Sequence, residues 1–244
     1  MTGRISCKMV AAYLREIGID YIPVPLRGPS SEAAGSAAKE EPDSPAAKPA
    51  VSPRKEREPH GGETLEEIRQ ELIACRGCPL CSGRRTVVFG VGNPHARLMF
   101  VGEGPGEEED RQGEPFVGAA GKRLNRWIAR IGLKREDVYI ANIVKCRPPG
   151  NRAPLPAEAA SCLPYLKRQI RTIRPEVLCT LGAVALQYLL DTNEKITRVR
   201  GRWRVFDGVP MLPTYHPAFI LRNQAREHEV FDDFDLLAER LRLK

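Results

Sequence analysis

The sequence predicts an α/β protein of three layers, in which a central, mainly parallel sheet of four strands carries helices on both faces. Four apolar runs have strand length and end in loop residues, and apolar residues at helical spacing lie between them. Strands that alternate with helices favour a parallel sheet. In such a sheet, a ligand binds beyond the carboxyl ends of the strands. The four runs cover residues 98–101, 138–144, 177–181 and 209–212.

Three helices of this domain are indicated by apolar residues that recur on one face. The first helix precedes the sheet and leads directly into Cys75. The other two lie between predicted strands and can cover the sheet. Their apolar faces consist of Leu65, Ile68 and Leu72, then Leu124, Trp127, Ile128 and Ile131, and finally Ala185, Leu186 and Leu189.

The first quarter of the chain differs in composition from the rest. Residues 7–17 have the apolar spacing of a short amphipathic helix, within an N-terminal segment that we place at 1–27. Residues 28–62 are rich in Ala, Pro, Ser and Glu and contain no aromatic residue. Such a composition offers too little apolar surface to offset the entropy of ordering, so we expect a disordered linker. One catalytic domain then spans 63–244.

The net charge is +7 and the pI is near 9.1, which favours a polyanionic partner because basic side chains release counterions when they neutralise phosphates. No window approaches the roughly 20 apolar residues needed to cross a bilayer, and the N-terminus lacks the pattern of a secretory signal. We therefore expect a soluble, cytoplasmic monomer without a membrane partner. The N-terminal tail is a candidate tether for a replication or repair protein.

Four of the seven cysteines have a spacing typical of a metal site. Cys75 and Cys78 form a CxxC pair that one turn can direct at a single metal or cluster, and Cys146 and Cys162 are separated by fifteen residues. Zinc and iron-sulfur clusters share thiolate ligands, and coordination chemistry alone favours zinc.

The remaining three cysteines have simpler interpretations. Cys81 extends the first pair to CxxCxxC, Cys179 lies in an apolar run, and Cys7 lies in the tail. None of the three needs to be a metal ligand, because a cysteine can simply be a small buried residue or a residue of the tail.

Two motifs follow predicted strands. GEGPGEEEDRQGEPFVG at 102–118 begins at the end of an apolar run, and HPA occupies 216–218. The glycines and proline of the first motif indicate a tight loop whose backbone N–H groups are open to a ligand. A nucleotide-binding, zinc-stabilised enzyme is one alternative, but GEGPG lacks the Lys and Ser/Thr of a phosphate-binding loop.

Three side chains near these motifs have both structural and functional interpretations. Phe116 follows a loop and can either fill the core or stack on a ligand. Asn142 lies within the apolar string IANIVK, where a buried amide needs hydrogen-bond partners. His216 can be a surface or capping residue, or a fixed N–H donor to an anion.

Together these motifs resemble the iron-sulfur uracil-DNA glycosylases of family 4, from about Glu66 to about Asp235. The resemblance implies an enzyme that hydrolyses the N-glycosidic bond of deoxyuridine in single- and double-stranded DNA. It also implies a structural 4Fe-4S cluster held by the four cysteines that match the family: Cys75, Cys78, Cys146 and Cys162.

The same resemblance assigns roles to the site. Phe116 matches the residue that stacks on the flipped base, Asn142 the residue that distinguishes uracil from cytosine, and His216 the donor to the leaving base. Asn151, in PPGNR, matches a residue that positions substrate, although GN after two prolines is also a strong turn signal.

The acidic residues are assigned in the same way. Glu103 and Glu109 match residues that position the attacking water or stabilise the sugar cation. Gly104 belongs to the expected uracil-binding set. Related glycosylases place an acidic, water-activating residue at this position, so the resemblance does not identify the general base of this chain. A cluster-bearing nucleic-acid adaptor without glycosylase activity is the main alternative function.

Two further segments are candidates for DNA contacts. Arginines alternate from Arg198 to Arg204, so a strand there would place them on one face as a phosphate-contacting ribbon or a solvated hairpin edge. The segment 219–222 occupies the place where the superfamily inserts an apolar wedge, with Leu221 as a weak candidate.

Overall fold

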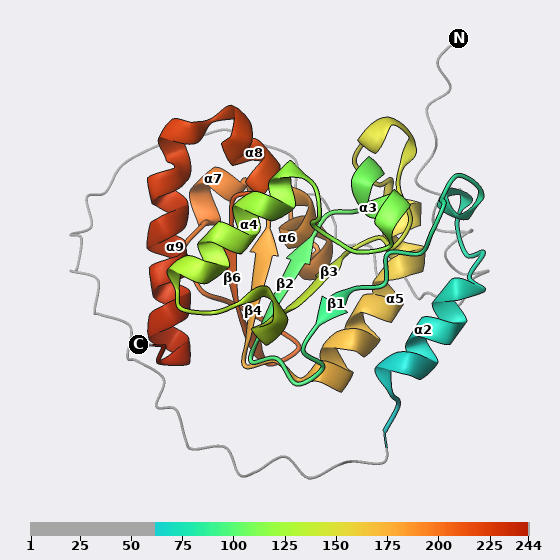
Figure 1. Cartoon of the computed structure of the whole chain (residues 1–244), viewed down its shortest axis with the longest axis horizontal. Helices are drawn as coiled ribbons and strands as arrows, with labels where there is room; N and C mark the ends of the chain where they lie inside the picture. The colour runs from blue at the N-terminus through green and yellow to red at the C-terminus, as the bar shows by residue number, and fades with distance from the viewer. Residues whose placement is uncertain (1–61, 244) are drawn as a thin grey trace, which may run out of the picture. The chain divides into compact units, whose positions relative to one another are not determined.

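The computed structural model describes residues 62–243 of the 244-residue chain (Figure 1). The helix expected at 7–17 and the linker expected at 28–62 lie outside this range, apart from the last linker residue. The elements, in chain order, are α2 Leu65–Ile73, η1 Pro79–Ser82, β1 Val91–Gly92, β2 Leu98–Gly102, α3 Glu107–Gln112, α4 Ala119–Arg130, η2 Arg135–Asp137, β3 Tyr139–Asn142, η3 Pro149–Asn151, α5 Pro156–Ile173, β4 Val177–Leu181, α6 Ala183–Leu190, α7 Ile196–Val199, β5 Arg204–Phe206, β6 Val209–Thr214, α8 Pro217–Arg222, η4 Gln224–Arg226 and α9 Glu227–Leu241.

The sheet has the strand order β1-β3-β2-β4-β6-β5. Its four central strands are the four predicted ones, and they run parallel to one another. The prediction of a four-stranded sheet was wrong at both edges, where β1 and β5 add antiparallel strands. These edge strands contain only two and three residues, too few for an alternating pattern to stand out in the sequence.

Helices cover both faces of the sheet, which confirms the three-layer prediction (Figure 1). On one face, α5 and α6 pack against residues such as Met99, Ala141 and Leu178. On the other face, α4, α8 and α9 pack against Phe100 and Leu212, among others. Every residue of β2, β3 and β4 is buried, as expected for parallel strands between two helical layers.

Helix α2 lies outside these layers and packs on α5. Its N-cap residue is Thr64, whose hydroxyl accepts from Glu67 N–H while the Glu67 carboxylate accepts from Thr64 N–H. This reciprocal capping box satisfies two backbone donors that a helix start leaves free. Ile68 and Leu72 then pack with Phe89. The packing fixes the end of α2, directly before Cys75.

The alternating arginines do not lie on one strand. The chain forms helix α7 up to Val199, and β5 begins only at Arg204, so the predicted ribbon from 198 to 204 was wrong. Arg200 turns inward and pairs with Asp233 of α9. Among the described helices, none combines the length and the apolar character that a bilayer span requires.

Candidate functional site

A cavity of about 430 Å³ opens at the carboxyl ends of the central strands. Glu103 follows β2, Asn142 ends β3, and His216 follows β6 by two residues. This placement agrees with the expectation that a ligand site lies beyond the carboxyl ends of parallel strands. All seven non-cysteine site residues predicted from the sequence line the cavity: Glu103, Gly104, Glu109, Phe116, Asn142, Asn151 and His216.

Asn142 presents an unpaired acceptor in this cavity. Its side chain is 1% exposed, and Oδ1 has no hydrogen-bond partner within the described part of the chain. A Cβ atom at Gly102, the neighbouring residue on β2, would lie 2.4 Å from this oxygen. Gly102 therefore leaves the space that Asn142 occupies. An unpaired polar atom in a buried position is costly, which points to a ligand that donates to Oδ1.

Phe116 lies beside Asn142 with a backbone that few residues other than glycine adopt. Its φ is +54°, in the left-handed region that is unfavourable for a bulky side chain. The ring lies against Gly102, where a Cβ would come within 2.5 Å of Cζ. Its centroid is 5.5 Å from that of the His216 ring, and the two planes are tilted by 37°. Phe116 thus contributes to the cavity wall and does not simply fill the core.

His216 is the N-cap residue of α8. Its Nδ1 accepts from the Ala218 backbone N–H at 3.1 Å, so in the neutral ring the proton is on Nε2. Burial, and secondarily the positive charge of Arg222, lowers the pKa of His216 to about 4. The imidazole is therefore neutral at pH 7 and carries one N–H donor that the cap does not use.

Two acidic residues of the cavity have different surroundings. Glu103 follows β2, and burial raises the pKa of its carboxyl group. Glu109 lies on α3, and its Oε1 accepts from the backbone N–H groups of Val117 and Gly118, each at 3.1 Å. Glu109 therefore binds the loop that carries Phe116, a contact that the sequence did not indicate.

The cavity lining includes two arginines that were not among the predicted site residues. These are Arg152 and Arg222, and Arg152 is held by a bidentate ion pair with Glu158. Asn151 is exposed, and its Oδ1 accepts from Arg147 Nε at 2.8 Å. A proline-rich turn followed by arginine is a weak signal, so only the fold identifies Arg152 as a neighbour of the cavity. Arg222 lies in the segment 219–222, from which only Leu221 was named as a candidate.

The apolar wedge candidate does not line the cavity. Phe219 does so together with Arg222, whereas Leu221 is half-buried on the same short helix. Gly104 approaches Val144 closely, since a Cβ at residue 104 would lie 2.8 Å from Val144 Cγ2. A side chain at this position would require movement of Val144.

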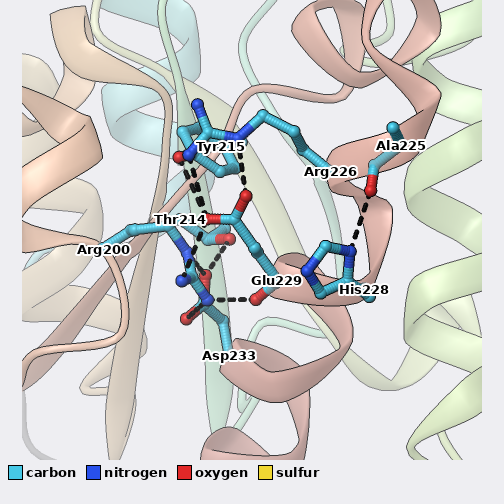
Figure 2. A network of polar contacts seen from close by, with 8 residues as sticks. All are labelled: Arg200, Thr214, Tyr215, Ala225, Arg226, His228, Glu229 and Asp233. Carbon is cyan, nitrogen blue, oxygen red and sulfur yellow. Dashed lines mark hydrogen bonds and ion pairs between the residues drawn. The ribbon is translucent and has the colours of Figure 1, made fainter.

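A polar network holds the end of β6 against α9 (Figure 2). Thr214 donates from Oγ1 to Asp233 Oδ2 at 2.6 Å, and the Tyr215 hydroxyl donates to Glu229 Oε2 at 3.2 Å. Arg200 bridges both carboxylates. Burial raises the pKa of Asp233 to about 6 against the opposing effect of Arg200. These contacts fix the two residues that immediately precede His216.

The four predicted ligand cysteines lie close enough to influence one another's pKa values. Cys75 follows α2, Cys78 is the N-cap residue of η1, Cys146 follows β3 and Cys162 lies in α5. Burial raises the pKa of the Cys162 thiol to about 11, and nearby Cys146 and Cys78 add to this rise. The pKa of the Cys146 thiol is raised first by burial and further by Cys78 and Cys75.

Two hydrogen bonds reach the sulfur atoms of this cysteine group. The Gly77 N–H donates to Cys75 Sγ at 3.4 Å, and Arg84 Nη1 donates to Cys146 Sγ at 3.2 Å. Such donors are typical of thiolates that bind iron-sulfur clusters. Within residues 62–243, no three His, Cys, Asp or Glu side chains converge in the arrangement that holds a single metal ion. Cys179 lies apart, fully buried in β4.

Comparison with known proteins places this arrangement in a family. Residues 89–242 match the Uracil DNA glycosylase superfamily. A type-4 uracil-DNA glycosylase of Thermotoga maritima is 47% identical over 169 residues, which cover 68% of this chain and 87% of the relative. This chain belongs to the type-4 uracil-DNA glycosylases.

Other relatives with the same name give similar values. The protein of Archaeoglobus fulgidus is 44% identical over 187 residues, or 72% of this chain and 93% of the relative. That of Sulfurisphaera tokodaii is 44% identical over 186 residues, or 72% of this chain and 84% of the relative. The superfamily match includes the whole cavity, whereas Cys75 and Cys78 precede its first residue. The family resemblance inferred from the sequence is confirmed.

Proposed function

We propose that this chain is a uracil-DNA glycosylase of base-excision repair. It hydrolyses the N-glycosidic bond of deoxyuridine in single- and double-stranded DNA, releases uracil and leaves an abasic site. The observation that carries this proposal is the convergence of Phe116, Asn142 and His216 on one cavity, with Asn142 Oδ1 unpaired. Names of the similar proteins support the same activity.

Asn142 selects the base by hydrogen bonding. Its amide offers one acceptor and one donor group, which complement the N3–H and O4 of uracil. Cytosine presents an acceptor at N3 and an amine at C4, so both contacts would be mismatched. A buried group that loses its partner discriminates strongly against the wrong substrate. The flipped base stacks on Phe116, as a base removed from the duplex requires an apolar face.

His216 stabilises the departing base. Negative charge develops on the uracil oxygens as the glycosidic bond breaks, and the Nε2–H donates to the oxygen at C2. The Ala218 cap fixes the tautomer and the direction of this donor. A preorganised donor in a buried site stabilises developing charge more effectively than a mobile one. His216 donates a hydrogen bond and not a proton, because the N–H of a neutral imidazole is a very weak acid.

Glu103 and Glu109 act on the sugar side of the reaction. Positive charge develops there, and a carboxylate near it stabilises the cation and orients the attacking water. Glu103 is half-buried and lines the cavity. Glu109 has one oxygen committed to the loop of Phe116, so it orders the site as well. Asn151 and Gly104 complete the substrate-binding set at the mouth.

DNA binds across the mouth of the cavity. Arg152 and Arg222 line the cavity, and the chain carries a net charge of +7, which favours the phosphate backbone. We also propose, from the sequence alone, a cytoplasmic monomer whose catalytic unit spans 63–244. The segment before it is the proposed contact for a replication or repair protein.

The cysteine group fits a structural 4Fe-4S cluster. The proposed ligands Cys75, Cys78, Cys146 and Cys162 form an all-thiolate set, and two N–H groups already point at their sulfurs. When bound, the cluster would brace α2 against α5 and the segment after β3, and it supplies no step of the hydrolysis. Zinc is the alternative metal. Absorbance near 400 nm in anaerobically purified protein would support iron and its absence would favour zinc.

An adaptor that binds nucleic acid without cleaving it is the competing function. An oligonucleotide assay separates the two. Cluster-loaded protein is incubated with single- and double-stranded DNA that contains one uracil, and alkali then cleaves any abasic site. The proposal predicts cleavage at uracil and none in the matched thymine substrate. Intact uracil DNA after this treatment would support the adaptor.

A further inference from the structure

Arg135 contacts the loop of Phe116 from outside the cavity. Its Nη1 donates to the Phe116 carbonyl oxygen at 3.2 Å, and its Nη2 donates to the Pro115 carbonyl oxygen. The same Nη1 donates to Asn125 Oδ1 at 3.1 Å. Arg135 lies in η2, between α4 and β3, and it is not among the residues that line the cavity. Its guanidinium therefore binds two successive carbonyl groups at the strained residue.

The backbone at Phe116 needs such support because its φ of +54° is unfavourable for a bulky side chain. A left-handed conformation at a non-glycine residue persists only where surrounding contacts enforce it. Glu109 binds the N–H groups that follow Phe116. On helix α4, a Cβ at Gly121 would lie 1.8 Å from the Phe116 carbonyl oxygen, so the helix packs directly against the same peptide group.

Two charged side chains hold the loop, each through the backbone groups of two residues. The carboxylate of Glu109 accepts from residues 117 and 118, and the guanidinium of Arg135 donates to residues 115 and 116. Only the planar fork of arginine presents several fixed N–H donors at once. A lysine would keep the charge but could not hold the same pair of carbonyls with Asn125 in this geometry.

We propose that Arg135 is a positioning residue that fixes the Phe116 ring in the orientation needed to stack on the flipped uracil. This inference rests on the proposed function and assigns a further determinant of the same site. Arg135 itself touches neither the base nor the sugar. It acts through the backbone of Phe116, so its effect depends on the presence of the aromatic ring.

Arg135→Gln and Phe116→Leu, alone and combined, test this dependence. Arg135→Gln should weaken inhibition by free uracil and lower kcat/KM for uracil DNA by about 10-fold to 100-fold, the scale expected for a misplaced binding group. In the Phe116→Leu background, the same change should cost at most about 2-fold, because no ring remains to be positioned. Asn125→Ala, which removes only the brace on Arg135, should give a smaller loss of the same kind.

Arg97→Gln is the matched control. Arg97 also donates to a backbone carbonyl, that of Leu241, far from the cavity. It should lower the melting temperature without changing uracil inhibition. Equal losses from Arg135→Gln with and without the Phe116 ring would overturn the inference, as would unchanged uracil inhibition. If Arg135→Gln does not fold, Asn125→Ala in both backgrounds decides in the same way. A wild-type protein inert on uracil DNA would instead overturn the proposed function and this inference together.

Discussion

The backbone N–H of Ala218 donates to Nδ1 of His216 at 3.1 Å, so the first turn of α8 sets the tautomer of the candidate catalytic histidine. Nε2 then keeps its proton and remains available as a donor. Tyr215 and Thr214, directly before His216, are held by α9. Contacts of the residues before and after His216 thus both restrict the position of its ring.

The first prediction concerns pH. Burial, helped by Arg222, lowers the pKa of His216 to about 4, so the neutral ring persists well below pH 7. The contribution of His216 to the rate should be constant from about pH 5.5 to pH 8 and fall only as pH approaches 4. The unfolded chain binds this proton more readily, so the stability that His216 contributes should decrease as pH falls from about 6.5 toward 4.

An NMR titration of the His216 ring, assigned with a His216→Asn variant, checks this prediction. An apparent pKa between 6 and 7, with a rate that changes in parallel, would contradict the neutral-donor account.

The second prediction concerns the space at the end of β2. Gly102→Ala would place a methyl group 2.4 Å from Asn142 Oδ1 and 2.5 Å from Phe116 Cζ. We expect the rate of uracil excision to fall by about 100-fold as both side chains move. Gly83→Ala is the control, because nothing lies within 4 Å of a Cβ there. Single-turnover rates and melting temperatures of both variants test it. A Gly102→Ala protein with the wild-type rate would show that this packing is irrelevant.

The third prediction concerns how Asn142 distinguishes uracil from cytosine. Asn142→Asp replaces the amide donor with a second acceptor, so O4 of uracil loses its partner while the amine of cytosine gains one. Uracil excision should decrease by at least about 100-fold, and the preference for uracil over cytosine should narrow. Excision rates on matched uracil and cytosine oligonucleotides measure both effects.

Asn93→Asp is the control for this substitution. Its Oδ1 only accepts from the His95 N–H, and aspartate keeps that acceptor, so activity should not change. An unaltered uracil-to-cytosine preference in Asn142→Asp would argue that another residue reads the base.

The fourth prediction concerns the network in Figure 2. Arg200→Met removes the cation that pairs with fully buried Asp233, and loss of one partner of a buried pair costs about 3 kcal/mol. Burial already raises the pKa of Asp233 to about 6, and loss of Arg200 raises it further. The loss of stability should therefore be largest at high pH and become smaller as pH falls to 6, because the carboxyl group of the variant is then protonated.

Urea unfolding at pH 5 and pH 7.5 measures this difference. Exposed Arg198→Met should change the free energy of unfolding by no more than about 0.5 kcal/mol. A pH-independent loss in Arg200→Met would refute the assigned role of Asp233.

The sequence predicted the central sheet from local patterns, whereas the cavity residues were assigned mainly by the family resemblance. Apolar runs mark buried parallel strands, and the polar residues directly after them must meet at one edge of the sheet. This rule placed Glu103, Asn142 and His216 near one another, and the family resemblance then assigned their roles. The edge strands β1 and β5 were missed because their two and three residues leave no pattern to read.

Other parts of the site depend on contacts between distant segments. Arg135 binds the carbonyl oxygen of Phe116 across nineteen positions of the chain, and a backbone acceptor leaves no trace in the sequence. Arg200 lies in an alternating row of arginines, yet it pairs inward because α9 brings Asp233 against it. Charge patterns predict exposed basic surfaces well only where tertiary packing supplies no buried partner.

A crystal structure of the wild-type protein with free uracil tests the central claim most directly. We predict that the pyrimidine lies against the Phe116 ring, with its N3–H on Asn142 Oδ1 and its C2 oxygen on His216 Nε2. Uracil bound elsewhere, or bound in this cavity with Asn142 Oδ1 still unpaired, would contradict the account.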